Sequence, residues 1–196
     1  MWNTILKSIG RHIQLTAEEV EYFTSLLTVR KLRKRQYLLQ EGDVMRLETF
    51  VSKGCLRSYE IDAKGQEHII QFSVEEWWVG DMYSFLTGTP SRLNIDCLED
   101  TEVIQFSKDQ LEELYVRVPK FERYFRLLVQ NAYIASQNRI LSIMTKPALE
   151  RYHEFLQKYP TIEQRVPNHQ IASFLGITPE SLSRLRKQYA SGKPLT

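Results

Sequence analysis

The sequence predicts an α+β protein in which a β-rich N-terminal region, one long helix and a small all-helical C-terminal region follow one another. Three observations carry this prediction. Short β-rich runs fill residues 36–107, apolar residues recur at helical spacing over residues 119–144, and two short helical patterns meet at Gly176. We place the corresponding domains at residues 1–118, 119–144 and 145–196.

The composition fits a folded cytoplasmic protein. Of the 196 residues 42% are hydrophobic, and 26 basic residues stand against 24 acidic ones, so the overall charge indicates no particular partner. No apolar run is long enough to span a bilayer and no signal-peptide pattern opens the chain, so we expect no membrane contact. Two cysteines, Cys55 and Cys97, are too few for a four-thiolate zinc or iron–sulfur site, and no metal site is predicted.

The first elements follow from a capping box and from strand texture. Thr16 with Glu19 three residues later predicts a helix to about Leu27. The β-rich runs that follow are QYLLQ, ETFVSKG, CLRSYEID, QEHIIQFSV, WWVG, NIDCLED and TEVIQFS. Strands this short, at near-regular spacing, predict a compact antiparallel sandwich or barrel. The basic run RKLRKR (residues 30–35) is either a patch for an anionic partner or the solvated side of the first strand, and we favour the second.

A long helix is predicted between the β-rich region and the C-terminal helices. Ser107 caps a short helix that ends before Pro119, and the long helix then runs to about Met144. Its seam positions alternate at spacings of four and three and are Phe121, Phe125, Leu128, Ala132, Ala135 and Arg139. Such a heptad pattern predicts a homodimer joined along this seam. The alternative is that the same stripe packs on the chain's own β-domain.

The C-terminal region has the pattern of a helix-turn-helix. A helix begins at Pro147 and ends at Pro160, and another runs from Pro167 to about Leu175. Gly176 permits the positive φ of a sharp turn, and the next helix is capped by Thr178 and starts at Pro179. The buried face of this last helix is predicted to be Leu182, Leu185 and Tyr189.

The opposite face of the last helix is suited to reading DNA bases. Arg184 can donate two parallel hydrogen bonds to a guanine, Glu180 can accept from a cytosine amino group, and Ser181 can contact a base or a phosphate. Contacts to the DNA backbone are expected from Asn168, His169, Gln170, Thr178, Arg186 and Lys187. Residues 167–196 carry four basic side chains against one acidic, a net charge of 4 − 1 = +3.

The three regions together resemble the Crp/Fnr family of bacterial transcription regulators over nearly the whole chain. The stretches that carry the resemblance are YLLQEGD, FVSKGCLRSYEIDAKGQE, WWVGDMYSFLTGTPS, EDTEVIQFSKDQLEEL and QIASFLGITPESLSRLRK. The resemblance implies a cyclic-nucleotide-binding-type β-roll (a jelly-roll-like double-stranded β-helix), a dimerisation helix and a helix-turn-helix domain. It also implies a homodimer that binds an inverted repeat in double-stranded DNA, responds to an effector and contacts RNA polymerase.

Two departures from the family pattern affect this expectation. Cyclic-AMP-binding members carry a Gly-Glu pair and, about ten residues on, an Arg-Ser or Arg-Thr pair; here Gly80-Asp81 stands first and Arg92 comes one position early. A one-residue shift on a strand turns a side chain to the other face, so we predict no cyclic AMP binding of the usual kind. The candidate pocket for an unidentified effector, or for none, comprises Phe72, Gly80, Asp81, Met82, Arg92, Leu93 and Asn94. Only ASGKPLT follows Tyr189, which predicts a truncated wing.

Two other functions are conceivable for a chain with a β-rich domain and C-terminal helices. A cupin-type metal enzyme needs two or three histidines and a carboxylate converging on one ion, whereas the four histidines here are isolated along the chain. No phosphate loop or nucleophile elbow is present either, so no enzymatic activity is predicted. The second rival is a ligand-binding regulatory module whose helix-turn-helix acts through protein contacts.

Overall fold

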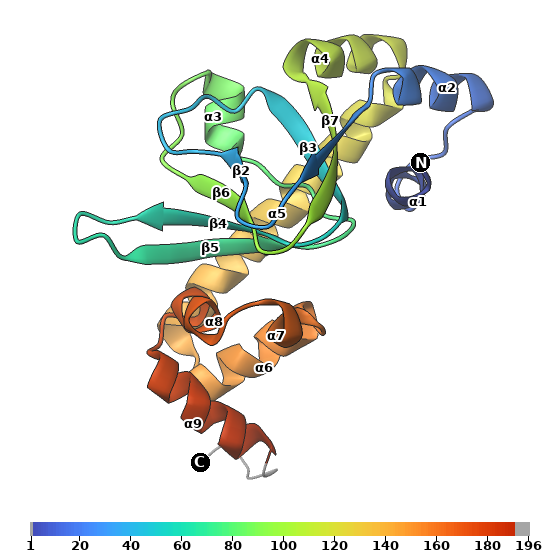
Figure 1. Ribbon diagram of the computed structural model, residues 1–196. Helices are drawn as coiled ribbons and strands as arrows, with labels where there is room; N and C mark the ends of the chain where they lie inside the picture. Colours follow the sequence, from blue (N-terminus) through green and yellow to red (C-terminus); the bar gives the residue numbers. More distant parts are fainter. Residues whose placement is uncertain (1, 191–196) are drawn as a thin grey trace. The chain divides into compact units, whose positions relative to one another are not determined.

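The computed structural model describes residues 2–190, which pack as two compact units (Figure 1). Unit 1 comprises Met1–Glu60 and Gln71–Gln130, and unit 2 comprises Ile61–Ile70 and Asn131–Thr196. The tip of one β-hairpin therefore belongs to the same unit as the C-terminal helices. The three-part division at residues 118 and 144 stays a prediction.

Unit 1 is built on two antiparallel sheets with strand orders β1-β7-β3 and β2-β6-β4-β5. The strands are β1 (Thr28–Leu32), β2 (Tyr37–Leu39), β3 (Leu47–Lys53), β4 (Leu56–Ile61), β5 (Glu67–Ser73), β6 (Asn94–Cys97) and β7 (Thr101–Ser107). The helices are α1 (Asn3–Gly10), α2 (Ala17–Ser25), α3 (Met82–Thr87), α4 (Lys108–Arg117) and the first part of α5 (Lys120–Thr145). The predicted α+β class, with an antiparallel β-domain and a long helix, is confirmed.

Local capping explains where α2, α3 and α4 of unit 1 begin. Thr16 and Ser107 each form a complete capping box, at the start of α2 and of α4 respectively. Two elements were not predicted, α1 and α3, although α3 carries a clear signal at each end. Asp81 accepts from the backbone N–H groups at its start, and Gly88, with φ 71°, closes it. The predicted WWVG strand forms only an isolated bridge between Phe50 and Trp78.

The start of α5 is buried in the core of unit 1, and this changes the predicted seam. The Phe121 ring lies 4.7 Å from that of Phe23, and the Phe125 ring lies 5.2 Å from that of Trp78. Phe121 is 0% exposed and Phe125 8% exposed, so neither has surface left for a second copy. For these two residues the alternative interpretation was right: the stripe packs on the chain's own β-domain. Leu128 is partly buried against the same core, whereas Ala132 and Ala135 are exposed.

Unit 2 consists of the hairpin tip, the second part of α5 and four short helices. These helices are α6 (Ala148–Lys158), α7 (Ile162–Arg165), α8 (Asn168–Leu175) and α9 (Pro179–Ala190). Their buried core is made of Tyr152, Phe155, Tyr159, Ile162, Val166, Ile171, Ala172, Phe174, Leu175 and Leu182. The segment TIEQRV, which lies between two of the predicted helices, contains α7. Tyr189, expected to be buried, is 46% exposed.

Candidate DNA interface and effector pocket

Helices α8 and α9 form the predicted helix-turn-helix, and each local signal acts as expected. Ala172 is fully buried, which lets the two helices approach closely. Gly176 ends α8 with φ 66°, a left-handed conformation that costs little only for glycine. The Ser181 backbone N–H donates to Thr178 Oγ1 at 3.2 Å, so Thr178 caps α9, which begins at Pro179.

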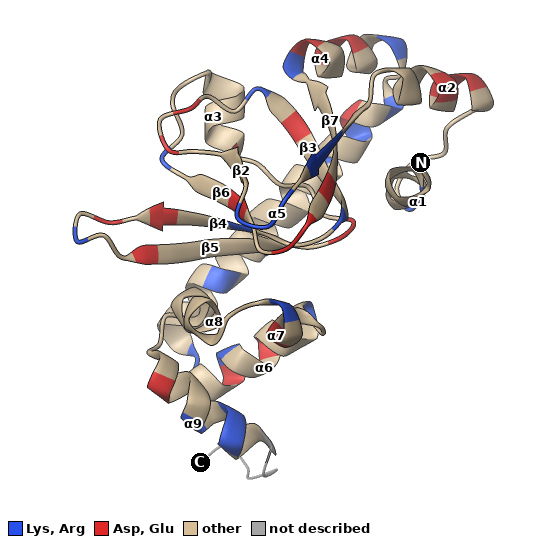
Figure 2. Ribbon diagram, viewed as in Figure 1, with Lys and Arg blue, Asp and Glu red and all other residues tan. Residues whose placement is uncertain are grey.

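The expected reading face of α9 is open to solvent. Glu180 and Arg184 are exposed and Ser181 is half-exposed. Arg184 Nη2 donates to Ser181 Oγ at 3.2 Å, so a neighbour on the same face orients the guanidinium. Hydrogen bonds from its own backbone N–H and from Thr178, with the Arg184 charge nearby, lower the pKa of Glu180, so its carboxylate is an acceptor at neutral pH. Figure 2 shows α9 opening on an acidic residue and carrying its basic residues further along.

The residues expected to contact DNA phosphates divide into two groups. Asn168, His169, Thr178 and Lys187 are exposed, although Asn168 Oδ1 already accepts from Arg186 and Thr178 Oγ1 already accepts from the Ser181 backbone N–H. Gln170 is buried at 7% exposure, because its position on α8 faces the packed side of the domain, so a phosphate contact from it is excluded in this conformation.

Arg186 is held inside unit 2 instead of extending into solvent. Its Nε donates to Glu163 Oε1 at 2.7 Å, and its Nη1 donates to Asn168 Oδ1. The Tyr152 hydroxyl donates to the same oxygen of Glu163 at 2.6 Å. The predicted phosphate contact therefore competes with an ion pair within the domain.

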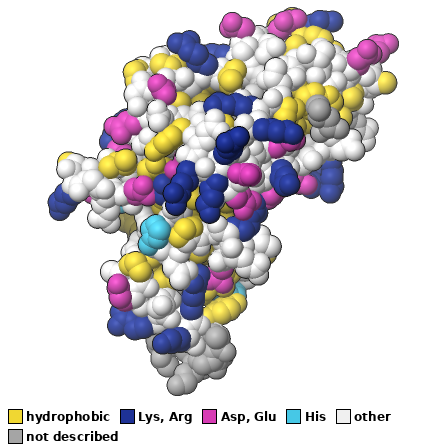
Figure 3. Space-filling view, in the orientation of Figure 1, with side chains coloured by type: hydrophobic (Ala, Val, Ile, Leu, Met, Phe, Trp, Pro, Cys, Tyr) yellow, Lys and Arg dark blue, Asp and Glu magenta, His cyan; other side chains and the backbone are white. Residues whose placement is uncertain are grey.

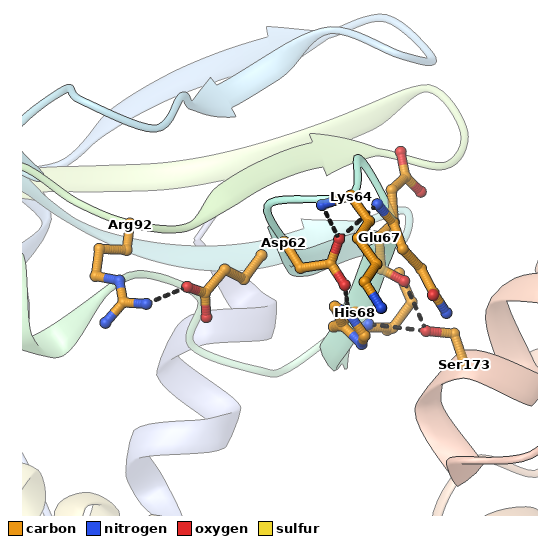
Figure 4. A network of polar contacts seen from close by, with 9 residues as sticks. Asp62, Lys64, Glu67, His68, Arg92 and Ser173 are labelled. Carbon is orange, nitrogen blue, oxygen red and sulfur yellow. Dashed lines mark hydrogen bonds and ion pairs between the residues drawn. The ribbon is translucent and has the colours of Figure 1, made fainter.

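The hairpin tip between β4 and β5 contacts α8 through one hydroxyl (Figure 4). Ser173 Oγ donates to the Glu67 carbonyl oxygen at 3.0 Å and accepts from the Ile69 N–H at 3.1 Å. Arg139 of α5 donates to the carbonyl oxygens of Ile69 and Phe174, at 3.1 and 3.2 Å, and its guanidinium lies 4.1 Å from the centre of the Phe174 ring. The sequence carried no signal for these contacts, because Ser173 and Ile69 are 104 positions apart.

At the predicted effector pocket, the Asp81 carboxylate already has hydrogen-bond partners. Its Oδ1 accepts from the backbone N–H groups of Tyr83 and Ser84, and its Oδ2 accepts from Ser91 Oγ at 2.7 Å. Asp81 is 8% exposed and Ser91 3% exposed. The structure thus pairs Asp81 with a hydroxyl and not with Arg92.

The remaining predicted pocket residues have separate surroundings. Arg92 pairs with Glu60 at the surface, and 82% of its side chain is exposed (Figure 4). Asn94 Oδ1 accepts from the backbone N–H of Glu41 at 3.1 Å. Phe72 is fully buried, Leu93 is half-exposed and Met82 is 44% exposed. A side chain at Gly80 would come within 3.0 Å of the Met45 side chain.

The chain is similar to known proteins over most of its length. Residues 29–117 match the model of the cyclic nucleotide-binding domain. The chain is 26% identical over 196 residues to the fumarate and nitrate reduction regulatory protein of Vibrio cholerae, covering 93% of this chain and 77% of that protein. It is 26% identical over 170 residues to the transcriptional activator protein FnrA of Stutzerimonas stutzeri, covering 80% and 68% of the two chains.

Solved structures agree on the fold. FixK2 from Bradyrhizobium japonicum superposes with a TM-score of 0.73 at 21% identity, covering 84% of this chain and 85% of that chain. The structure of the regulator CLP from Xanthomonas campestris superposes with a TM-score of 0.69 at 15% identity, covering 90% and 92%. The chain belongs to the Crp/Fnr family. It is a DNA-binding transcription regulator of that family.

This Crp/Fnr regulator also has a buried ion pair that sequence analysis did not find. Arg57 on β4 and Asp96 on β6 are cross-strand partners, joined by Nε–Oδ1 and Nη2–Oδ2 hydrogen bonds of 2.7 and 3.0 Å. The Arg57 guanidinium also lies 4.2 Å from the centre of the Tyr59 ring. Only the strand register brings these residues together, and periodicity within one strand carries no information on register.

The basic run of this Crp/Fnr regulator lies on β1 and the turn after it. Arg30 and Arg33 are exposed, and Lys31 Nζ lies 3.8 Å from Glu102 Oε2 on the neighbouring strand. Figure 3 shows basic and acidic side chains intermixed on the face in view. Among residues 2–190 no helix is long and apolar enough to cross a membrane. The predicted truncated wing lies outside the described residues.

Proposed function

We propose that this Crp/Fnr regulator reads an inverted repeat in double-stranded DNA with Glu180, Ser181 and Arg184. One observation supports this most directly: Arg184 is exposed on the face of α9 opposite the buried Leu182, and Ser181 orients its guanidinium. An oriented guanidinium can donate both hydrogen bonds to guanine O6 and N7, a pair that contributes about 1–3 kcal/mol of discrimination. Asn168, His169, Thr178 and Lys187 then contact phosphates and set the register.

Binding to duplex DNA selected from a random pool tests this reading. The wild-type protein is expected to enrich an inverted repeat, and Arg184→Ala is expected to lower affinity for it about tenfold or more while weak non-specific binding persists. Arg46→Ala, which removes an exposed arginine from a loop of unit 1, is the matched control and should bind like the wild type. Equal binding by the Arg184→Ala and wild-type proteins would exclude base reading by this side chain.

We propose further that two copies associate through the exposed apolar face of α5. This face carries Tyr133, Ile134, Ile140, Leu141 and Met144, which are 53–76% exposed. Their spacings of four and seven residues place them on one side of the helix, and large exposed apolar surfaces mark interaction sites. A second copy of the same helix presents the matching surface, as twofold symmetry requires. The seam therefore differs from the one that the heptad pattern predicted.

Sedimentation tests the dimer. Ile140→Asp is expected to convert a dimer into a monomer at micromolar concentration, because it places a charge in an apolar contact. Val116→Asp is the control, since Val116 on α4 is equally apolar and 80% exposed. A wild-type protein that is monomeric at these concentrations would refute the proposed contact.

We propose that the pocket around Asp81 does not take cyclic AMP in the usual way. The carboxylate already accepts from Ser91 and from two backbone N–H groups, and Arg92 pairs with Glu60 at the surface. An anionic phosphate in a buried site without a cation bears a desolvation cost of several kcal/mol. Calorimetric titration with cyclic AMP is expected to give no heat of binding. Micromolar binding that Ser91→Ala abolishes would contradict this proposal. We also propose that the protein acts in the cytoplasm and contacts RNA polymerase there.

A further inference from the structure

One guanidinium links the recognition helix α9 to two other helices of unit 2. Arg186 Nε donates to Glu163 Oε1 of α7 at 2.7 Å, and Nη2 lies 2.7 Å from the same oxygen. Nη1 donates to Asn168 Oδ1 in the first turn of α8. Only 27% of the Arg186 side chain is exposed. Hydrogen bonds to a charged group are among the stronger ones in proteins, so this arrangement resists displacement.

Helix α6 joins the same cluster through Tyr152. Its hydroxyl donates to Glu163 Oε1 at 2.6 Å, and its ring packs edge-on against Tyr189 of α9, with 5.7 Å between ring centres. Burial, together with the hydrogen bond to Glu163, raises the pKa of Tyr152 to about 12, so the hydroxyl remains a donor at all physiological pH values. We call Tyr152, Glu163, Asn168 and Arg186 the bracket.

The bracket holds the side of α9 that faces away from the reading face. Residues two apart on an α-helix point about 200° apart, so Arg186 lies nearly opposite Arg184. Lys187, the next residue, is exposed. For Arg186 to contact a phosphate, its hydrogen bonds to Glu163 and Asn168 would have to break.

We propose that Arg186 is a positioning residue that fixes the rotation of α9 about its axis, and that it is not a phosphate contact. The proposal rests on the DNA reading proposed above. Side chains project to roughly 5–6 Å from the helix axis, so a rotation of about 20° moves the reading atoms by about 2 Å. Hydrogen bonds to base edges do not survive such a displacement, because donor–acceptor distances span only a few tenths of an ångström. Loss of the bracket therefore removes discrimination between sequences.

Two measurements on duplex DNA distinguish positioning from phosphate binding. They are the ratio of affinities for the selected site and for a scrambled site, and the slope of log affinity against log salt concentration. Arg186→Gln is expected to lower the ratio about tenfold and to leave the slope unchanged. A phosphate contact predicts the reverse, with an unchanged ratio and a slope smaller by about 1. That reverse result would overturn the proposal.

Glu163→Gln is the sharper variant, because it breaks the bracket while every positive charge of α9 stays in place. The proposal predicts the same fall in the ratio as for Arg186→Gln, and no additional fall in the double variant. If Arg186 bound phosphate, releasing it from Glu163 would leave affinity equal or higher with the ratio intact, and this outcome would also refute positioning.

Two controls complete the experiment. Lys187→Gln removes an exposed neighbouring charge and should reduce the slope by about 1 with the ratio unchanged. Circular dichroism and thermal melting check that each variant is folded. If Arg186→Gln is unfolded, Arg186→Lys replaces it, because lysine keeps the positive charge but lacks the planar, two-pronged guanidinium. This variant should give an affinity ratio between those of the wild type and Glu163→Gln. A lysine variant with the full wild-type ratio would overturn positioning by the guanidinium. A wild-type protein that selects no site refutes the DNA reading itself, whereas selection with an unchanged ratio in Glu163→Gln refutes only the bracket.

Discussion

Glu48 should make the stability of this protein depend on pH near neutrality. It lies on β3 opposite Phe106 of β7 and is 9% exposed. Burial raises the pKa of its carboxyl from about 4.5 to about 7. Burial, and then the charge of Glu48, also raises the pKa of Tyr115 on α4.

The sign of the effect follows from proton binding. Between pH 4.5 and 7 the folded state keeps a proton that the unfolded state has already released, so the free energy of unfolding falls as pH rises. A shift of about 2.5 pKa units corresponds to about 3 kcal/mol, lost fully once the pH exceeds 7. Glu48→Gln removes this loss, because the amide stays neutral. The variant should therefore be more stable than the wild type by up to about 3 kcal/mol at pH 8.

Urea titrations at pH 5 and pH 8 measure this difference. At pH 5 the variant and the wild type should differ by less than about 1 kcal/mol, because this pH is only about half a unit above the pKa of Glu48 in the unfolded state and little of the loss has yet developed. Glu112→Gln, an exposed carboxylate on α4, is the control and should show no such pH-dependent gain. A Glu48→Gln protein that is less stable than the wild type at pH 8, or a difference of equal size at both pH values, would refute the reasoning.

Three further outcomes are expected. Phe121→Ala should destabilise unit 1 by about 3–5 kcal/mol in urea titrations, since it leaves a cavity beside Phe23, and a loss under 1 kcal/mol would argue against that packing. Ser173→Ala removes two hydrogen bonds to the hairpin tip and should speed hydrogen exchange of the β5 amides there; unchanged exchange would contradict the contact. Gly54→Ala should lower the melting temperature far more than Gly65→Ala. Both glycines have positive φ, but only at Gly54 would the added Cβ come within 2.4 Å of another atom, Thr101 Oγ1. Similar melting temperatures for the two variants would count against this geometry.

Local signals in the sequence located the helix starts well. The capping boxes at Thr16 and Ser107 and the glycine turn at Gly176 act through neighbours within four residues, so the chain itself carries the information. The same kind of signal flanks α3, with Asp81 at its start and Gly88 at its end.

Face assignments were less secure, because they depend on what packs against an element. The stripe of Phe121 and Phe125 was compatible with a partner helix or with the chain's own sheets, and periodicity alone could not distinguish the two. Arg186 shows the same limit at the candidate site. A basic residue on the second helix of a helix-turn-helix is compatible with phosphate binding or with an internal ion pair. The Arg186–Glu163 ion pair joins α9 to α7, two helices whose contact the sequence does not indicate.

The sequence by itself determined the order of the β-domain, the long helix and the helix-turn-helix, and the exposed positions Glu180 and Arg184. These depend on periodicity, caps and turns, which act over a few residues. Only the tertiary structure decided that Phe121 and Phe125 are core residues, that Arg57 pairs with Asp96, and that Ser173 meets the hairpin tip. These contacts join positions far apart in the chain, and sheet register and helix packing bring them together.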